Sequence, residues 1–168
     1  MIALEKNYTT ISSHPFAKVM LDNDTQQLSL VSTHYFTVND VVATFNAEAI
    51  YSIPNYLTVQ IGENQHVTLS PSFLQYINHS CEPNVFFDTS MMQLICLQPI
   101  AAGDEFCFFY PSSEWDMAQP FVCHCGTPSC IALISGAAHV DKDVIGQYRV
   151  TDFIAGQLLD GCPRPLKG

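Results

Sequence analysis

Lysine and arginine are absent from the sequence between Val19 and Asp141. That stretch carries twelve carboxylates, and the whole chain has 16 acidic residues against six basic ones, which gives a net charge of −10. A surface with this charge repels phosphate backbones and anionic lipid headgroups, whereas it attracts lysine-rich or arginine-rich partners. We therefore expect a basic protein or peptide as partner, and no direct binding to nucleic acid or to membranes.

Long apolar runs are also missing. No stretch of 18 apolar residues occurs, and the first ten residues include Glu5 and Lys6 in place of the apolar core of a secretion signal. With 48% hydrophobic and 13% charged residues, the chain is too apolar for intrinsic disorder and too poor in charge for a coiled coil. The 168 residues predict one folded intracellular domain, cytoplasmic or nuclear, whose oligomeric state the sequence leaves open.

Short runs rich in β-branched and aromatic residues follow one another along most of the chain, a pattern that is typical of strands. Turn residues such as Asn39-Asp40 and Ala102-Gly103-Asp104 separate these runs. The spacing predicts a mainly β protein built from several small sheets. The predicted strands are residues 34–38, 41–45, 57–61, 66–69, 84–87, 93–97 and 105–110.

Two short helical segments are predicted beside the strands. Residues 71–76 begin with proline, which is tolerated at an early position of a helix, and we expect one helical turn there. Residues 152–159 place apolar side chains at helical spacing behind a Thr151 or Asp152 cap. This pattern predicts a short helix near the C-terminus.

The seven cysteines are an odd number, and three of them form the compact motif Cys-x-Cys-x4-Cys at Cys123, Cys125 and Cys130. The motif is too tight for an ordinary disulfide framework, and Gly126 allows the backbone to curl so that the three sulfurs face one point. Structural zinc takes four tetrahedral ligands, and the candidate for the fourth is Cys81. The sequence therefore predicts Zn2+ held by four cysteines in a reducing compartment.

Other interpretations of the cysteines remain open in the sequence. His79 and His124 are reserve ligands for the metal, while the clustered cysteines are also compatible with two disulfides or with reduced thiols that only pack. Cys96, Cys107 and Cys162 are interpreted as buried or idle thiols.

Three blocks of the sequence, taken together and in this order, resemble the SET-domain protein lysine methyltransferases. Residues 78–84, Asn-His-Ser-Cys-Glu-Pro-Asn, are similar to the family's Asn-His-Ser-Cys-x-Pro-Asn loop. Residues 102–110, Ala-Gly-Asp-Glu-Phe-Cys-Phe-Phe-Tyr, resemble its Gly-Glu-Glu-Leu-Thr-Phe-Asp-Tyr strand, and residues 123–130 resemble its post-SET zinc segment. The resemblance extends over roughly residues 8–136.

This resemblance implies a SET-domain fold in which small β-sheets surround a C-terminal pseudoknot, followed by a zinc-bound post-SET segment. The expected divisions are a SET domain over residues 1–120, a post-SET segment over 121–136 and a C-terminal extension over 137–168. The implied activity is the S-adenosylmethionine-dependent methylation of a lysine side chain in a basic protein, a histone tail or another.

The resemblance also assigns roles to individual residues. Tyr110 is expected at the methyl-transfer point, and Asn78 and His79 are expected to hold the cofactor. The family's Gly-x-Gly is absent, because Ser12-Ser13-His14 stands in its place. Beside that segment, His14, Phe16 and Lys18 are the further candidates for cofactor binding.

A lysine channel is implied as well, with Phe108, Tyr51 and Tyr56 as its candidate residues. The position of Phe108 resembles the family's phenylalanine/tyrosine switch. Phenylalanine has no hydroxyl, and its presence at this position predicts di- or trimethylation. Phe109 departs from the family's usual Asp.

Two rival hypotheses remain beside the methyltransferase. One is a SET-like domain that has lost catalysis and binds a basic peptide through its acidic face. The other is an unrelated interaction module stapled by zinc, in which Tyr110 is an ordinary core aromatic.

Overall fold

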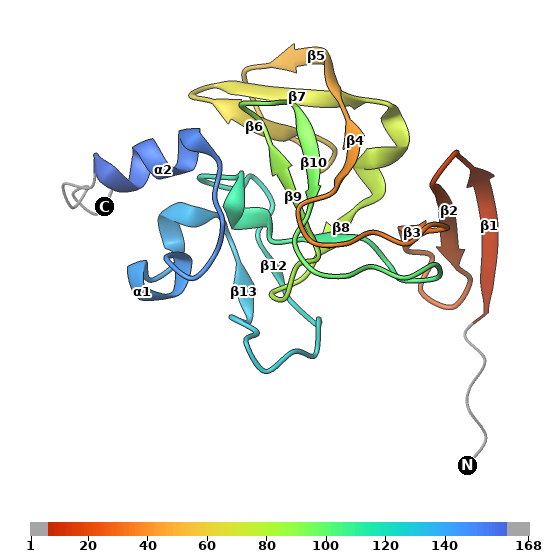
Figure 1. Ribbon diagram of the computed structural model, residues 1–168. Helices are drawn as coiled ribbons and strands as arrows, with labels where there is room; N and C mark the ends of the chain where they lie inside the picture. Colours follow the sequence, from red (N-terminus) through yellow and green to blue (C-terminus); the bar gives the residue numbers. More distant parts are fainter. Residues whose placement is uncertain (1–6, 161–168) are drawn as a thin grey trace.

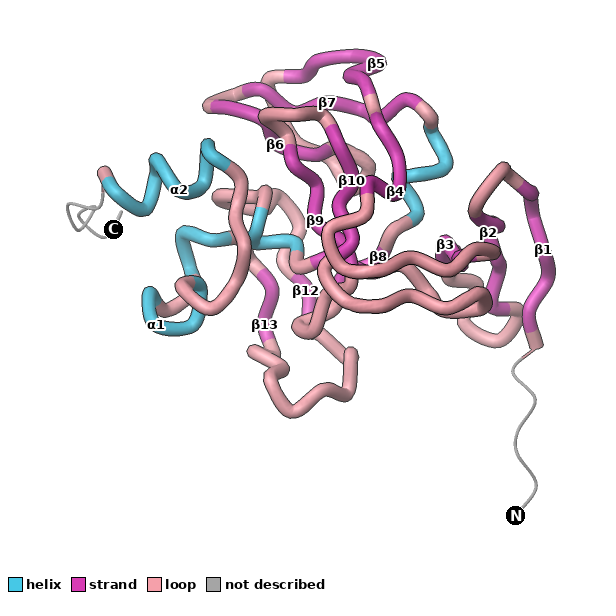
Figure 2. The backbone as a smooth tube through the Cα atoms, in the orientation of Figure 1, coloured by secondary structure: helices cyan, strands magenta, loops and turns pink. Residues whose placement is uncertain are grey.

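The computed structural model describes residues 7–160 of the chain. The described part contains five small sheets and several short helical segments, and Figure 2 shows long loops between them. The three-stranded antiparallel sheets are β1-β2-β3 (Tyr8–Ser13, Ala17–Asp22, Leu28–Ser32), β4-β10-β9 (Val41–Thr44, Gln93–Cys96, Val85–Asp88) and β5-β7-β6 (Asn46–Tyr51, Gln65–Ser70, Val59–Gly62). The two-stranded sheets are the parallel pair β8-β11 (Asn78–His79, Cys107–Phe108) and the antiparallel pair β12-β13 (Phe121–Val122, Leu133–Ile134).

The N-terminal sheet and the C-terminal helices lie on opposite sides of the molecule, with the other sheets between them (Figure 1). The helices are α1 (Lys142–Ile145) and α2 (Asp152–Leu159), and three 3-10 helices cover Ser72–Tyr76, Tyr110–Ser112 and Ala137–His139. The prediction of a mainly β fold of several small sheets with a short C-terminal helix is confirmed. No helix among the described residues is long and apolar enough to cross a bilayer.

Most predicted elements are present in the structure within one or two residues. Five predicted strands correspond to β4, β6, β7, β9 and β10, and the predicted helical turn is the 3-10 helix Ser72–Tyr76. The predicted C-terminal helix is α2, whose N-cap is Thr151, because the Thr151 side chain accepts a hydrogen bond from the Ile154 N–H at 3.3 Å.

Two predicted strands need correction. Residues 34–38 form no strand, because only Phe36 pairs there, through an isolated bridge to Ile100. The predicted strand over residues 105–110 is reduced to β11, because the chain turns into a 3-10 helix at Tyr110 with Pro111 behind it. The strands that are additional to the prediction are β1, β2, β3, β5, β8, β12 and β13.

Two apolar cores hold the sheets together. The larger core lies among the first three sheets and includes Phe45, Phe87 and Phe106. The second core packs the C-terminal helices against the cysteine-rich region, and it includes Phe109 and Ile154 with two buried cysteines. Tyr110 contacts both cores, so its position depends on how the two halves of the chain meet.

Residues 103–108 connect the N-terminal sheet to the centre of the molecule. Phe106 donates a backbone hydrogen bond to Leu30 in β3, and the chain then pairs in parallel with β8 through β11. The Asn84 side chain holds this passage on both sides: its amide donates to the Glu105 carbonyl at 2.9 Å, and its oxygen accepts from the Cys107 N–H at 2.9 Å. The pairing brings residues 78–84 beside residues 105–110, whereas the threading of a pseudoknot stays a prediction.

The C-terminal extension, described up to residue 160, packs onto the segment that follows Tyr110. Ala137 donates a backbone hydrogen bond to the Glu114 carbonyl at 2.8 Å, and Thr151 donates one to the Ser112 carbonyl at 2.9 Å. A side chain at Gly136 is excluded, because its Cβ would lie 2.5 Å from the Trp115 carbonyl oxygen. The extension therefore supports residues 110–115 from behind.

Candidate active site and metal centre

Tyr110 begins the 3-10 helix that follows β11, and its backbone faces His79 on β8. Its N–H donates a 3.1 Å hydrogen bond to His79 Nδ1, while its side-chain hydroxyl donates to the Ile77 carbonyl oxygen at 3.4 Å. Its ring lies beside Phe108, with the ring centroids 4.6 Å apart. Tyr110 is therefore anchored through its backbone and packed at its ring, so that its hydroxyl has a defined position.

His79 joins Tyr110 to the cysteine cluster. Because Nδ1 accepts the Tyr110 N–H, the ring proton sits on Nε2, which lies 3.4 Å from Cys81 Sγ. Burial lowers the pKa of His79 to about 4, so the imidazole is neutral near pH 7. A neutral ring with this tautomer donates to the sulfur and accepts from the tyrosine backbone at the same time.

The Tyr110 hydroxyl keeps its proton at physiological pH. Burial, together with the nearby carboxyl groups of Glu114 and Glu105, raises the pKa of Tyr110 to about 12. At this site Tyr110 is thus a hydrogen-bond donor and a neutral dipole, not a phenolate.

The Tyr110 side chain lines a cleft of about 1050 Å³. Its wall includes Asn78, His79 and Phe108 from the strands around Tyr110, Tyr56 from the loop before β6, and the residues that lead into β12. The volume reaches the upper end of the range for small-molecule sites, about 300–1,000 Å³. The cleft has room for a cofactor and for part of a second substrate.

The cleft wall is acidic. Three carboxyl groups, those of Asp22, Glu105 and Glu114, line it, and no lysine or arginine is among its described lining residues. Such a wall favours ligands that carry positive charge. Both a sulfonium and a lysine ammonium meet this requirement.

Asn78 has an acceptor available on this wall. Its side-chain amide donates to the Leu28 carbonyl at 2.8 Å and to the Glu105 carboxylate at 3.2 Å. Within residues 7–160, no hydrogen bond reaches its side-chain oxygen. The Asn78 oxygen and the Glu105 carboxylate could accept hydrogen bonds from the cationic end of S-adenosylmethionine, so the residues present fit this cofactor.

The other residues predicted to bind the cofactor lie away from the cleft lining. His14 stacks on Phe73 with a 4.0 Å centroid distance, and Phe16 packs into the larger core against the same ring. Lys18 lies exposed in β2, opposite Ser13 of β1. Their part in cofactor binding stays a prediction.

The residues predicted for the lysine channel lie in different places. Phe108 and Tyr56 line the cleft, whereas Tyr51 lies exposed at the end of β5.

Four cysteines converge at the other end of the His79 side chain. The sulfur atoms of Cys81, Cys123, Cys125 and Cys130 all lie within 4.8 Å of one another, and those of Cys81 and Cys123 are 4.0 Å apart. Zinc–sulfur bonds of about 2.3 Å in a tetrahedron place the sulfurs about 3.8 Å apart. The donor set and its spacing therefore fit the predicted zinc ion, with Cys81 as the fourth ligand.

The local backbone and hydrogen bonds determine the direction and the ionisation of these sulfurs. Gly126 has a φ of +71°, which allows the predicted curl between Cys125 and Cys130. Burial opposes the ionisation of Cys125, yet hydrogen bonds from the Thr127 side chain and backbone outweigh it and lower its pKa to about 6. Burial raises the pKa of Cys123 to about 11, so a bound cation would be needed to ionise that thiol.

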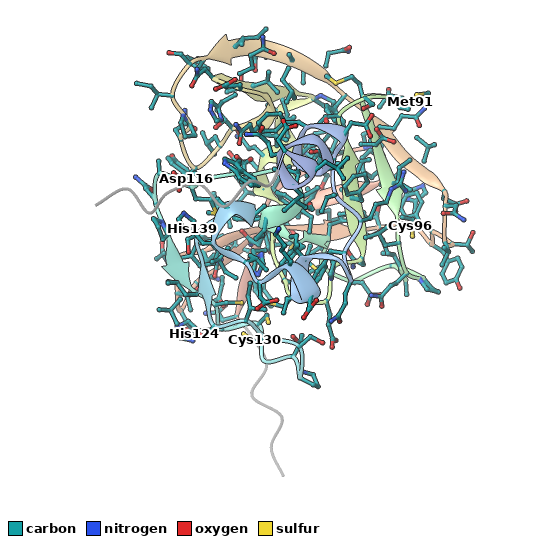
Figure 3. The ribbon with its side chains drawn as sticks, turned by 90° about the vertical axis from the view of Figure 1, so that its left-hand side faces the viewer. Met91, Cys96, Asp116, His124, Cys130 and His139 are labelled. Atoms are coloured by element: carbon teal, nitrogen blue, oxygen red, sulfur yellow. The ribbon has the colours of Figure 1, made fainter. Side chains whose placement is uncertain are left out.

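The remaining cysteines and histidines are outside the cluster. The described cysteines are all free, which excludes the alternative of disulfides among them, and Cys96 lies apart from Cys130 in Figure 3. His124, labelled near Cys130 in the same view, is exposed and is not one of the four converging residues, and His79 contacts Cys81 as a hydrogen-bond partner. Cys162 lies outside the described residues.

Glu114 is the site residue that sequence reasoning missed. It lines the cleft four residues after Tyr110 and is only 8% exposed. The available signal was a carboxylate set between Tyr110 and the single tryptophan of the chain, in an otherwise apolar or small-residue segment.

Known proteins resemble this chain over the same region. Residues 6–111 match the family model of the SET domain. Methyltransferase flvH of Aspergillus flavus is 40% identical over 114 residues, covering 64% of this chain and 64% of that protein. The H3 lysine-36-specific histone-lysine N-methyltransferase of Schizosaccharomyces pombe is 32% identical over 93 residues, covering 51% of this chain and 11% of that enzyme. The match thus spans less than two thirds of either relative.

Among solved structures, the methyltransferase domain of the human histone-lysine N-methyltransferase SETMAR superposes with a TM-score of 0.48 and 15% sequence identity. The superposition covers 79% of this chain and 59% of that one.

Proposed function

This chain belongs to the SET-domain family, and on that premise we propose that it transfers a methyl group from S-adenosylmethionine to the side-chain amine of a lysine in a basic protein. The observation that carries the proposal is the placement of Tyr110, Asn78 and His79 on one acidic cleft. The name of the fission-yeast relative, an H3 lysine-36-specific methyltransferase, supports a protein lysine as substrate.

The residues of the cleft align the reactants and exclude water. S-adenosylmethionine, when bound, supplies the electrophilic methyl group of its sulfonium. The Asn78 oxygen and the Glu105 carboxylate accept hydrogen bonds from the cationic end of the donor, while the Tyr110 hydroxyl and the ring of Phe108 border the transfer point. Alignment of this kind lowers the activation barrier considerably, because the reaction makes one bond and breaks another in line.

The charge of the cleft selects the second substrate. A lysine ammonium loses water when it enters a narrow site, and an acidic wall offsets part of that cost. The carboxylates from Val19 to Asp141, apart from buried Glu114, extend the same attraction over the surface. A basic segment of a protein is therefore favoured over a neutral or acidic one.

The four cysteines support the cleft from its far side. Cys81, Cys123, Cys125 and Cys130 would hold the zinc ion, which ties the loop after β8 to the hairpin of β12 and β13. Since Cys123 and Cys125 also line the cleft, this link fixes one of its walls.

The test is a transfer assay with methyl-labelled S-adenosylmethionine over purified core histones and ribosomal proteins. Label on a lysine of one of these proteins is the expected result. Tyr110→Phe is the control: it keeps the backbone bond to His79 and the ring packing but removes the hydroxyl. We expect it to bind the donor in calorimetry and to transfer at least about 100-fold more slowly. Equal rates for the two proteins would refute the role of Tyr110.

A second candidate function is binding of a basic peptide without transfer. The observation that favours it is His14, which stands in place of a family glycine and stacks on Phe73. Under this alternative, calorimetry detects no S-adenosylmethionine binding to the wild-type protein, while a histone tail peptide still binds.

A further inference from the structure

Glu114 is a buried carboxyl group on the wall of the cleft that contains Tyr110. The residue is 8% exposed, yet it belongs to the cleft lining. It takes no part in holding the donor, which is assigned above to Asn78 and Glu105, and it is not a ligand of the cysteine cluster. A buried carboxyl group at such a place calls for a physical explanation.

The position of Glu114 is fixed from three sides. Its carboxylate oxygen Oε1 accepts a 3.1 Å hydrogen bond from the Gln60 N–H in β6. Its own N–H donates to the Tyr110 carbonyl at 3.0 Å, and its carbonyl accepts from the Ala137 N–H at 2.8 Å. Residue 114 is thus held beside Tyr110 by its own turn and by the C-terminal extension through its backbone, and by β6 through its carboxylate.

No cation of the described chain neutralises this carboxyl group. The ion pairs within residues 7–160 are His139 with Asp116 and Arg149 with Asp88, and neither includes Glu114. Burying a carboxylate without a counterion is costly. Accordingly, burial raises the pKa of Glu114 to about 8, although the hydrogen bonds from Gln60 and Ser113 oppose the shift. The other titratable groups beside Tyr110 are Glu105 and His79, and neither supplies a positive charge near pH 7, because burial lowers the pKa of His79 to about 4.

Resting on the proposed function, we infer that the Glu114 carboxylate is the ion-pair partner of the substrate's lysine ammonium and removes its proton before methyl transfer. The missing counterion then arrives with the substrate. The reaction requires a proton acceptor such as Glu114, because lysine has a pKa of about 10.4 and its amine is protonated near neutral pH.

In its ionised form, which predominates above about pH 8, Glu114 takes one proton from Nζ, and this leaves a neutral amine and a carboxylic acid. The amine lone pair forms the new nitrogen–carbon bond while the carbon–sulfur bond breaks, and its electron pair stays on sulfur. The product is a methylated ammonium, and Glu114 returns its proton to water when the product leaves.

The alternative is a purely structural role, in which Glu114 only accepts the Gln60 N–H. Glu114→Gln separates the two, because it keeps an acceptor for Gln60 and removes the charge. Glu114→Asp keeps the charge on a shorter side chain. The matched control is Glu63→Gln, which removes one carboxylate from the exposed turn between β6 and β7, outside the cleft lining.

The binding test uses n-butylammonium, the lysine side chain without its backbone, and the neutral n-butanol. Both are titrated at about pH 9, where the ammonium is still charged and most of Glu114 is ionised. The NMR resonances of Tyr110 and Met117, two residues of the cleft lining, report the dissociation constants. We expect wild-type protein, Glu63→Gln and Glu114→Asp to prefer the ammonium by about tenfold or more, and Glu114→Gln to lose this preference. A preference that persists in Glu114→Gln, or that the wild type lacks, overturns the inference.

The transfer assay then separates this inference from the function on which it rests. If the wild type methylates a lysine, Glu114→Gln should lower kcat/KM by about 100-fold, with donor binding unchanged in calorimetry. Unchanged kcat/KM in that variant would refute proton removal by Glu114. If the wild type labels no protein, the proposed function fails, whereas the ammonium preference at Glu114 is still measured by NMR.

Discussion

The rings of Phe109 and Tyr148 stack face to face, with centroids 3.7 Å apart and an interplanar angle of 8°. Phe109 precedes Tyr110, at the position where the resembling family usually has Asp. Tyr148 comes from the C-terminal extension, and its hydroxyl also donates a 2.6 Å hydrogen bond to the Cys81 carbonyl oxygen. One side chain of the extension thus contacts both the segment of the candidate catalytic tyrosine and a candidate metal ligand.

Truncation of Tyr148 should destabilise the protein. Tyr148→Ala removes the stack and the hydrogen bond, and we expect it to lower the free energy of unfolding by about 2–3 kcal/mol. Tyr148→Phe removes only the hydrogen bond, with an expected loss of about 1 kcal/mol. Urea unfolding followed by fluorescence measures both. The control is Tyr35→Ala, since Tyr35 is 66% exposed and its truncation should change little. A Tyr148→Ala protein as stable as the wild type would refute a supporting role for the extension.

Much of the fold was predictable where local chemistry and final environment agree. Helix α2 follows from its Thr151 cap and apolar spacing, and the buried strand β10 follows from its apolar run. The strand expected at residues 105–110 is shortened to β11, because the Asn84 side chain bonds the Glu105 carbonyl and the chain turns into a 3-10 helix at Tyr110. Strand β1 escaped prediction because its side chains are nearly all exposed, and pairing with β2 alone holds it in place.

The zinc site yields a second prediction. Purified protein should contain about one equivalent of zinc per chain, and Cys81→Ser should lower that value well below one, because it removes one of four converging sulfurs. Cys107→Ser is the matched control: Cys107 lies near the same loop, with its sulfur 3.8 Å from the Glu82 carbonyl, but outside the cluster. Atomic absorption measures the metal. Equal zinc content in the two variants would remove Cys81 from the ligand set.

A third prediction concerns stability and pH. The pKa of Glu114 rises from an ordinary 4.5 to about 8 in the folded protein. Between these two values the folded state binds more protons than the unfolded state, so this group makes the free energy of unfolding fall as pH rises, by at most about 1.4 kcal/mol per pH unit. Above about pH 8 the decline ends. Glu114→Gln should remove it.

The measurement for Glu114 is urea unfolding of wild type and Glu114→Gln at intervals from pH 5 to pH 9. The difference between the two proteins cancels the contributions of other groups, including His79, whose lowered pKa acts in the opposite direction. A difference that stays constant across this range would show that Glu114 ionises normally.

The site was predictable where its residues belong to short local sequence motifs. Asn78, His79 and Tyr110 meet because β8 pairs in parallel with β11, which is a relation between two short motifs. Glu114 could not be predicted in the same way. Its burial arises from Gln60, 54 positions earlier, and from Ala137 in the extension, and neither contact leaves a local pattern.

The fourth prediction concerns the number of methyl groups transferred. Phe108 is 7% exposed and lies between Phe87 and Tyr110, with ring centroids 4.8 and 4.6 Å away. Its ring offers no hydroxyl to hold a water molecule beside the amine, which leaves space for an amine that already carries a methyl group. Phe108→Tyr should fill this space with a hydroxyl and shift the product from di- or trimethyl-lysine toward monomethyl-lysine.

Mass spectrometry of the methylated substrate measures that product distribution. Phe121→Tyr is the control, because it adds a hydroxyl to a different ring of the same cleft, one whose centroid is 5.7 Å from that of Tyr110. We expect its products to match those of the wild type. If Phe108→Tyr and the wild type gave the same ratio of mono-, di- and trimethyl-lysine at equal turnover, the space beside Phe108 would not set the methylation state, because the added hydroxyl would then lie outside the path of the amine.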